Sequence, residues 1–279
     1  MKLNERAALM RLTIGLPGEQ RQDADLSKTV KEAHNLGERS GRWIKSLYPE
    51  DALKPIKKLD NEARSFHDAV TLPFEAGIGI LPAALILEYG DRMRDFKGRR
   101  ENLVENHFLA KYEDWVEWAK KEHNGTFDQS MYPGVDKIRE KFYFRTEPLP
   151  VPSAAHFQNT VSSLLGTDVE SVEERVRDAT KEAQQELMRR LVKPVKYMAE
   201  TLSKEKPKIF DTIISNIEDI VKLAPSLNLS GDVTIDTFVK EMQALTQFDP
   251  DRFRKSEVER AKAAASAKEV LTRLEAYKL

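Results

Sequence analysis

The chain has 279 residues, and its 45 Lys and Arg residues nearly balance its 46 Asp and Glu residues, giving a formal net charge of −1. Proteins that grip duplex DNA through its phosphates carry a basic excess, so any nucleic-acid role here must rest on local patches. The absence of cysteine excludes disulfides, cysteine-ligated zinc and cysteine nucleophiles, and no apolar run approaches the roughly 18 residues of a membrane helix.

The first part of the chain predicts one strand followed by two helices. Residues 8–16 alternate apolar and polar side chains as a half-buried strand does, and the turn formers Pro17 and Gly18 end it. Helical periodicity then predicts helices over 24–47 and 51–71.

The segment 72–82 combines apolar side chains with turn-forming glycine and proline. It is interpreted either as a tight connection packed against the core or as a mobile apolar finger that docks on a partner. The first interpretation is favoured because buried loops need their backbone groups satisfied locally. In the second, the partner contacts are Phe74, Ile78 and Ile80.

A long helix is predicted over 82–122, where apolar residues recur in steps of three and four. The pattern lapses across the polar stretch 97–102, which indicates a kink or a break. Trp115 and Trp118 share one face of this helix with Tyr112. We interpret that face as core or partner interface rather than as a platform for stacked bases.

An extended segment follows a short helix expected over 134–140. In residues 141–149 the side chains of Phe142 and Phe144 share one face of the predicted strand. Because a lone strand is not stable, we expect this segment to pair with 8–16 as a two-stranded ribbon.

The C-terminal part predicts four helices. A narrow apolar seam runs along 168–203 and, like a coiled-coil stripe, needs a partner helix from this chain or from another copy. Pro194 lies inside this pattern and is expected to bend the helix. The other three helices are expected over 207–223, 233–246 and 250–277.

These elements predict a mainly α fold: an elongated bundle of long antiparallel helices with the small ribbon of 8–16 and 141–149. We divide the chain into an N-terminal region, 1–152, and a C-terminal helical region, 153–279. The second is expected to be continuous with the first rather than to fold independently.

The sequence holds no recognisable catalytic or cofactor motif. The five histidines are scattered and none forms a His-x-x-x-His pair, so no helical zinc site is predicted. No glycine-rich phosphate loop with its lysine is present, and no Gly-x-Ser-x-Gly turn. We therefore predict a protein that is not an enzyme and that holds no cofactor and no metal.

Two clusters of cations could contact nucleic acid, one at the polar lapse of the long helix and one where aromatic residues alternate with cations. This mixture suits single strands, because bases stack on exposed rings while cations meet phosphates. The candidate residues are Arg92, Arg94, Lys97, Arg99, Arg100, Lys137, Arg139, Lys141, Tyr143 and Arg145.

A structural alternative competes with each cluster. Phe142 and Phe144 suit the core of the predicted ribbon, and the arginines of the long helix can pair with Asp91, Asp95 and Glu101. We favour this alternative for both clusters.

Several phrases occur in a familiar order across residues 1–160. They include Asn4-Glu5-Arg6-Ala7, Thr71-Leu72-Pro73-Phe74, Leu81-Pro82-Ala83, Tyr132-Pro133 and Leu149-Pro150-Val151-Pro152. In these phrases the chain resembles a domain-of-unknown-function family encoded mostly by tailed bacteriophages and prophages. The resemblance implies a phage protein made in the host bacterial cytoplasm, and it brings no catalytic residues.

Two functions follow as the main hypotheses, and a third, disfavoured one is an enzyme whose site is assembled from residues distant in sequence. The first is a non-enzymatic interaction protein (a scaffold, an adaptor or an anti-defence factor) that acts through helix faces, self-associates and binds a host or phage protein. The second is an accessory protein of phage replication or recombination that binds single-stranded DNA or RNA. Neither hypothesis involves a membrane.

Overall fold

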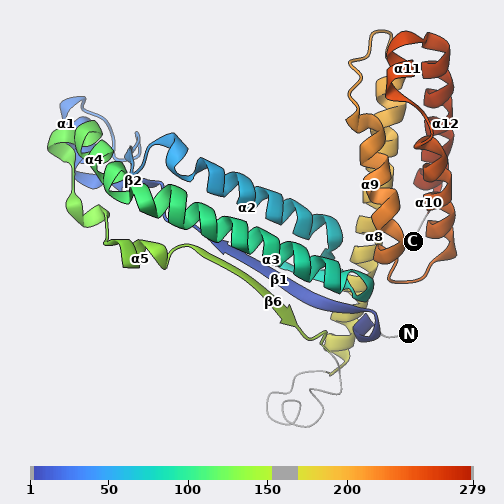
Figure 1. The fold of residues 1–279 in the computed structure, drawn as a ribbon, viewed down its shortest axis with the longest axis horizontal. Coiled ribbons are helices and arrows are strands. Elements are labelled where there is room, and N and C mark those ends of the chain that lie inside the picture. The colour runs from blue at the N-terminus through green and yellow to red at the C-terminus, as the bar shows by residue number, and fades with distance from the viewer. Residues whose placement is uncertain (1–2, 153–168, 278–279) are drawn as a thin grey trace. The chain divides into compact units, whose positions relative to one another are not determined.

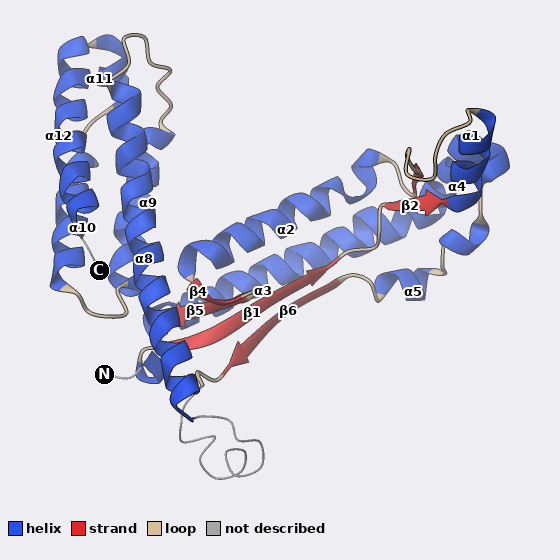
Figure 2. Ribbon diagram, turned by 180° about the vertical axis from the view of Figure 1, so that it is seen from behind, coloured by secondary structure: helices blue, strands red, loops and turns tan. Residues whose placement is uncertain are grey.

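A computed structural model describes residues 3–152 and 169–277, and it is mainly helical with a small antiparallel sheet (Figure 1, Figure 2). The predicted mainly α class is therefore confirmed. The chain forms two compact units, which we call unit 1 (Met1–Arg11, Asp68–Tyr89 and Glu147–Leu279) and unit 2 (Leu12–His67 and Gly90–Thr146).

The predicted pairing of the two strands is confirmed, but the two-stranded ribbon is wrong. β1 (Ala7–Gly15) and β6 (Tyr143–Leu149) are neighbours in a four-stranded sheet of order β4-β5-β1-β6. The two further strands, β4 (Leu72–Glu75) and β5 (Ile78–Pro82), form a hairpin where we expected a connection.

The hairpin has a simple physical basis that the glycine and proline content obscured. Gly77 has φ +75°, which lets the chain reverse between the strands. Leu72 then pairs with Ile80, which in turn pairs with Leu9 of β1, and all three side chains are buried. The apolar side chains of this segment therefore contribute to the buried face of the sheet.

The predicted helix 24–47 is wrong beyond its first part. α1 covers only Ala24–Ala33, and β3 (Trp43–Ser46) pairs with β2 (Gln20–Asp23) as a separate two-stranded sheet. The backbone leaves the helical region because Asn35 and Gly41 take φ values of 51° and 147°.

The predicted long helix 82–122 is present with its interruption displaced. α3 (Ile86–Leu103) runs straight through the polar stretch, and α4 covers Tyr112–His123. Between them lie a π-helical turn over Val104–Phe108 and a 3-10 turn over Leu109–Lys111. The apolar periodicity shifts phase there, which is the usual effect of such a turn.

The other helices follow the predicted spans with two differences. α8 (Val169–Leu202) covers its predicted span with Pro194 inside it, whereas α9 starts later than expected, at Thr212. A predicted single helix at the end divides at Ser256, whose hydroxyl accepts the Glu259 amide at 3.3 Å. The remaining bounds are α2 (Glu50–Val70), α5 (Val135–Arg139), α9 (Thr212–Leu227), α10 (Val233–Leu245), α11 (Pro250–Lys255) and α12 (Glu257–Ala276).

Each unit has its own core. In unit 1, α8 packs against α9 and α12, so the predicted seam of α8 finds partner helices within the chain. In unit 2, the core centres on a cluster of aromatic rings in which Tyr48 contacts Phe108 edge to face at 5.1 Å. That cluster fixes the start of α2 against the α3–α4 region, and α2 carries the candidate site.

Candidate functional site

The first predicted cation cluster is largely neutralised on the surface of α3. Arg94 pairs with Asp91, Lys97 lies 3.9 Å from Glu101, and Arg99 lies 3.3 Å from Asp95. The ion-pairing alternative is therefore confirmed for these residues. The pairs are mostly exposed, so each contributes little to stability and a stronger anion could displace the carboxylates.

Arg100 differs from the other cations of this cluster because it is buried. Its Nε donates to Asp60 at 2.7 Å and its Nη2 donates to the Gly15 carbonyl at 2.7 Å, with both side chains at most 3% exposed. A guanidinium held in this way cannot reach a phosphate. Arg100 therefore stabilises the core of unit 2.

In the second predicted cluster, cations and aromatic rings divide between surface and core. Arg139 donates to Glu105 and Asp136, whereas Lys137 and Lys141 are exposed. Arg145 lies over the ring of Tyr143 at 5.3 Å. Phe144 is buried, as the core interpretation predicts.

The apolar residues proposed as partner contacts lie mostly in cores. Phe74 and Ile80 are buried in unit 1, and Ile78 packs partly against them. Trp115 and Trp118 pack partly against the core of unit 2, so the core interpretation holds for most of their surface.

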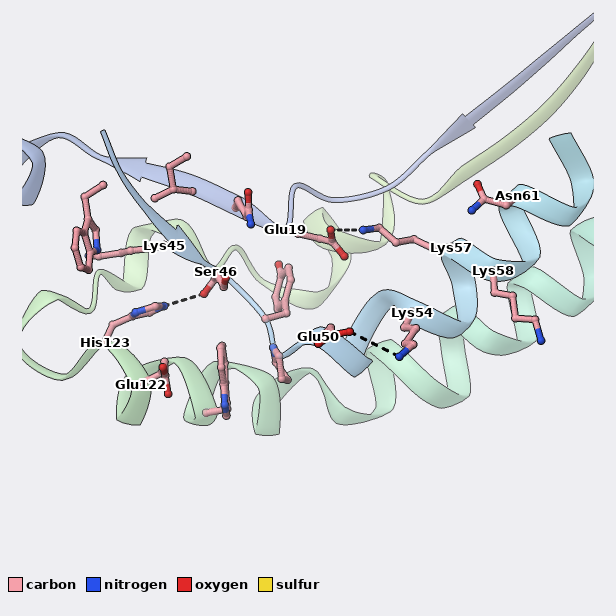
Figure 3. A pocket seen from close by; sticks show the side chains of 16 residues that line it. Glu19, Lys45, Ser46, Glu50, Lys54, Lys57, Lys58, Asn61, Glu122 and His123 are labelled. Atoms are coloured by element: carbon pink, nitrogen blue, oxygen red, sulfur yellow. Dashed lines mark hydrogen bonds and ion pairs between the residues drawn. The ribbon is translucent and has the colours of Figure 1, made fainter. Parts of the chain in front are cut away.

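A hollow of unit 2 with a partly polar lining lies at the start of α2, between β3 and the end of α4 (Figure 3). We call it the α2 cleft. Its volume is about 880 Å³. The residues that line it are Glu19, Gln20, Trp43, Ile44, Lys45, Ser46, Tyr48, Pro49, Glu50, Lys54, Lys57, Lys58, Asn61, Trp118, Glu122 and His123.

Two smaller hollows continue this cleft along α2. One, of about 600 Å³, includes Glu62 and Arg99, and the other, of about 500 Å³, includes Arg92 and Phe96. Lys58 lines all three hollows, so they are neighbours along α2, and we call the three together the α2 groove.

The spacing of the α2 side chains explains how one helix lines the groove. Lys54, Lys57, Lys58 and Asn61 are separated by three, one and three residues, which places them on one face of the helix. The opposite face carries buried Leu53 and Ile56, which pack into the core of unit 2. The core thus orients the cations toward the groove.

The cations of the groove differ in how firmly they are held. Lys57 pairs with Glu19, and Lys54 lies 3.7 Å from Glu50 (Figure 3). Lys58 has no ion pair within the described part of the chain. All three side chains are exposed and can turn toward an incoming anion.

Unlike these exposed lysines, Lys45 is buried and holds the wall of the cleft in place. It is 4% exposed, pairs with Asp23 and donates to the Thr126 carbonyl. The hydrogen bond from Lys45 holds the pKa of the Asp23 carboxyl below its ordinary value of 3.8. Asp23 also caps α1 by accepting the Leu26 amide, so this pair fixes the wall of the cleft.

Aromatic rings accompany the cations in two of the three hollows. Trp43 is 50% exposed at the mouth of the cleft, and Trp118 lines it from α4. Further along, Arg92 lies 5.6 Å from the centre of the Phe96 ring, and Arg99 lies 5.8 Å from it. Phe96 is 3% exposed and Trp118 is partly buried, so a flat group in the groove would stack mainly on Trp43.

Sequence reasoning placed three of the groove residues among its candidates, Arg92 and Arg99 as nucleic-acid contacts and Trp118 as a partner contact, and missed the rest. The helical spacing of Lys54, Lys57 and Lys58 could have revealed a cationic face of α2. Trp43 could not have been found, because the sequence predicted a helix where β3 forms.

Comparisons with known proteins add no relative. The chain matches no protein-family model, no curated protein and no solved structure. Within the described ranges, no group of three or more His, Asp or Glu side chains is placed to hold a metal ion. Every helix in those same ranges is too short or too polar to span a membrane.

Proposed function

We propose that this protein is a non-enzymatic binding protein and that a single strand of nucleic acid lies in its α2 groove. The observation that carries the proposal is the half-exposed ring of Trp43 in a cleft lined by Lys54, Lys57 and Lys58, with Arg92 and Arg99 in the neighbouring hollows. Proteins that bind single strands combine a cationic channel that follows the phosphates with rings on which bases stack.

The chemistry assigns a role to each part of the groove. Lys54, Lys57 and Lys58 meet phosphates at the cleft, and Arg92 and Arg99 meet them further along. Trp43 offers an exposed face to a base. Because the overall charge is −1, this local arrangement has to supply the attraction that a basic protein would supply globally.

Four carboxylates also line the groove: Glu19, Glu50, Glu62 and Glu122. Glu62 lies 3.6 Å from Arg99, and the side chains in the ion pairs of Glu19, Glu50 and Glu62 are all at least 37% exposed. Exposed pairs of this kind are worth about 0–1 kcal/mol, so a phosphate can replace these three carboxylates at little cost.

Two histidines of unit 2 contact the backbone through one ring nitrogen. The Nε2 atom of His123 is 2.8 Å from the Ser46 carbonyl oxygen, and that of His107 is 3.2 Å from the Asp51 carbonyl oxygen. Because the chain resembles phage-encoded proteins, we propose that it acts in phage replication or recombination in the host cytoplasm.

The test is binding of a fluorescent oligothymidylate, measured by anisotropy at several salt concentrations. We expect salt-sensitive binding, accompanied by a change in tryptophan fluorescence because all three tryptophans lie in unit 2. The double variant Lys54→Glu/Lys58→Glu should weaken binding by about tenfold or more. It should also reduce the salt slope by about 1.4, at roughly 0.7 for each phosphate that is no longer neutralised.

A matched control reverses two other exposed lysines of unit 2, Lys137 and Lys141. The variant Lys137→Glu/Lys141→Glu should bind nearly as well as the native protein. If it loses binding while Lys54→Glu/Lys58→Glu retains it, the strand lies elsewhere and the groove is wrong. If the native protein does not bind at low salt, the function itself is wrong.

A further inference from the structure

Unit 1 contains a second groove, apolar where the α2 groove is polar. It lies between α8 and α9, with the end of α12 closing one side, and its volume is about 1030 Å³. We call it the α8–α9 groove. Every residue that lines it belongs to unit 1.

The floor of this groove consists of apolar side chains. Met188, Ile220 and Leu274 are buried at its base, and Val192 and Leu223 are partly buried. The ring of Tyr197 is 40% exposed and also lines the groove. Tyrosine is among the residues that most often dominate binding energy at protein interfaces.

The dimensions of the groove fit one short helix. Its lining extends along α8 from Met188 to Glu200 and along α9 from Thr212 to Leu223. At a rise of 1.5 Å per residue these stretches are about 18 and 16 Å long, which corresponds to roughly three turns of a helix. Two adjacent helices with apolar side chains between them form a groove into which a third helix can pack.

The α8 rim of the groove is mainly cationic. Arg189, Lys193 and Lys196 follow one another on α8 at spacings of four and three residues, with Glu200 at the end of this rim, whereas Asp219 stands on the α9 side. Arg189 pairs with Glu186 at 2.9 Å. Lys193 and Lys196 have no ion pair within residues 3–152 and 169–277.

We infer that the α8–α9 groove binds one amphipathic helix of a protein partner, with acidic residues along the flank that faces α8. The apolar floor buries the leucine-like stripe of such a helix, and Lys193 and Lys196 pair with its carboxylates. Complementary charge of this kind fixes the orientation of the helix and excludes helices with a basic flank. This site is separate from the α2 groove.

Synthetic helices test the assignment with the full chain. Two fluorescent peptides of about 12 residues, or about 18 Å as helices, share one leucine stripe and carry either glutamates or lysines on one flank. We expect the glutamate peptide to bind and the lysine peptide to bind at least about tenfold more weakly. The double variant Lys193→Glu/Lys196→Glu should reverse this preference.

Two further measurements keep the assignment falsifiable. Lys240→Glu/Lys262→Glu, which reverses two exposed lysines of unit 1 outside the groove, should leave the preference unchanged. The inference would be overturned if both peptides bound equally well or if neither bound. It would also be overturned if light scattering showed a dimer that the glutamate peptide dissociates, because a second copy of the chain would then occupy the groove. Oligothymidylate binding should be the same in all these variants, so failure here is distinguishable from failure of the α2 groove.

Discussion

At the scale of single residues, the pair of Arg100 and Asp60 shows how burial changes the meaning of a charge. In the sequence, Arg100 is one of five cations in a cluster; in the structure, its guanidinium is buried between Asp60, the Gly15 carbonyl and the ring of Phe142. Burying both charges costs desolvation energy that only this full set of partners offsets.

Removing one partner should therefore be more costly than removing both. We expect Asp60→Ala to reduce the free energy of unfolding by about 3–5 kcal/mol, because Arg100 is left buried without its anion. The double variant Asp60→Leu/Arg100→Met should recover most of that loss. Urea unfolding of the three proteins, followed by tryptophan fluorescence, measures both effects. Equal losses in the single and double variants would contradict this account.

At the scale of elements, periodicity predicted the helices well and the strands poorly. α2, α8 and α10 begin and end within a few residues of their predicted spans, because long apolar stripes at steps of three and four have few alternatives. The hairpin β4–β5 and the strand β3 were missed, since short apolar runs beside glycine or proline fit both a loop and a strand. Tertiary pairing decides such segments.

The same limit explains the candidate sites. Local sequence found cations but could not tell buried from exposed, so it grouped Arg100 with Arg99. It could not bring Trp43 beside α2 either, because the two are joined only by the fold of unit 2. The alternation of side chains in 8–16 and 141–149 did predict the pairing of β1 with β6, because a lone strand is not stable and each segment had to pair with another strand.

The pairing of β1 with β6 has a specific test. The ring of Tyr143 on β6 lies directly over Gly15 of β1, where a methyl group would overlap it. We expect Gly15→Ala to destabilise the protein by about 1–3 kcal/mol, as overpacking does. The same change in a Tyr143→Ala background should cost much less. Thermal unfolding of the four proteins gives the coupling, and additive effects would show that the two residues do not touch.

At the scale of the whole molecule, the two units carry grooves of different chemistry. Unit 2 presents cations and rings suited to a phosphate chain, and unit 1 presents an apolar channel suited to a helix. A protein with both would bring a nucleic-acid strand and a protein partner onto one chain. This proposal joins the two functions that the sequence suggested as alternatives.

The most direct measurement of the central claim is photo-cross-linking of an oligothymidylate that carries a photoreactive thymine analogue, with the cross-linked peptides identified by mass spectrometry. We predict cross-links to Trp43 and to neighbouring residues of the α2 cleft, and their disappearance in Lys54→Glu/Lys58→Glu. Cross-links confined to 137–145, or spread over both units without preference, would contradict the account.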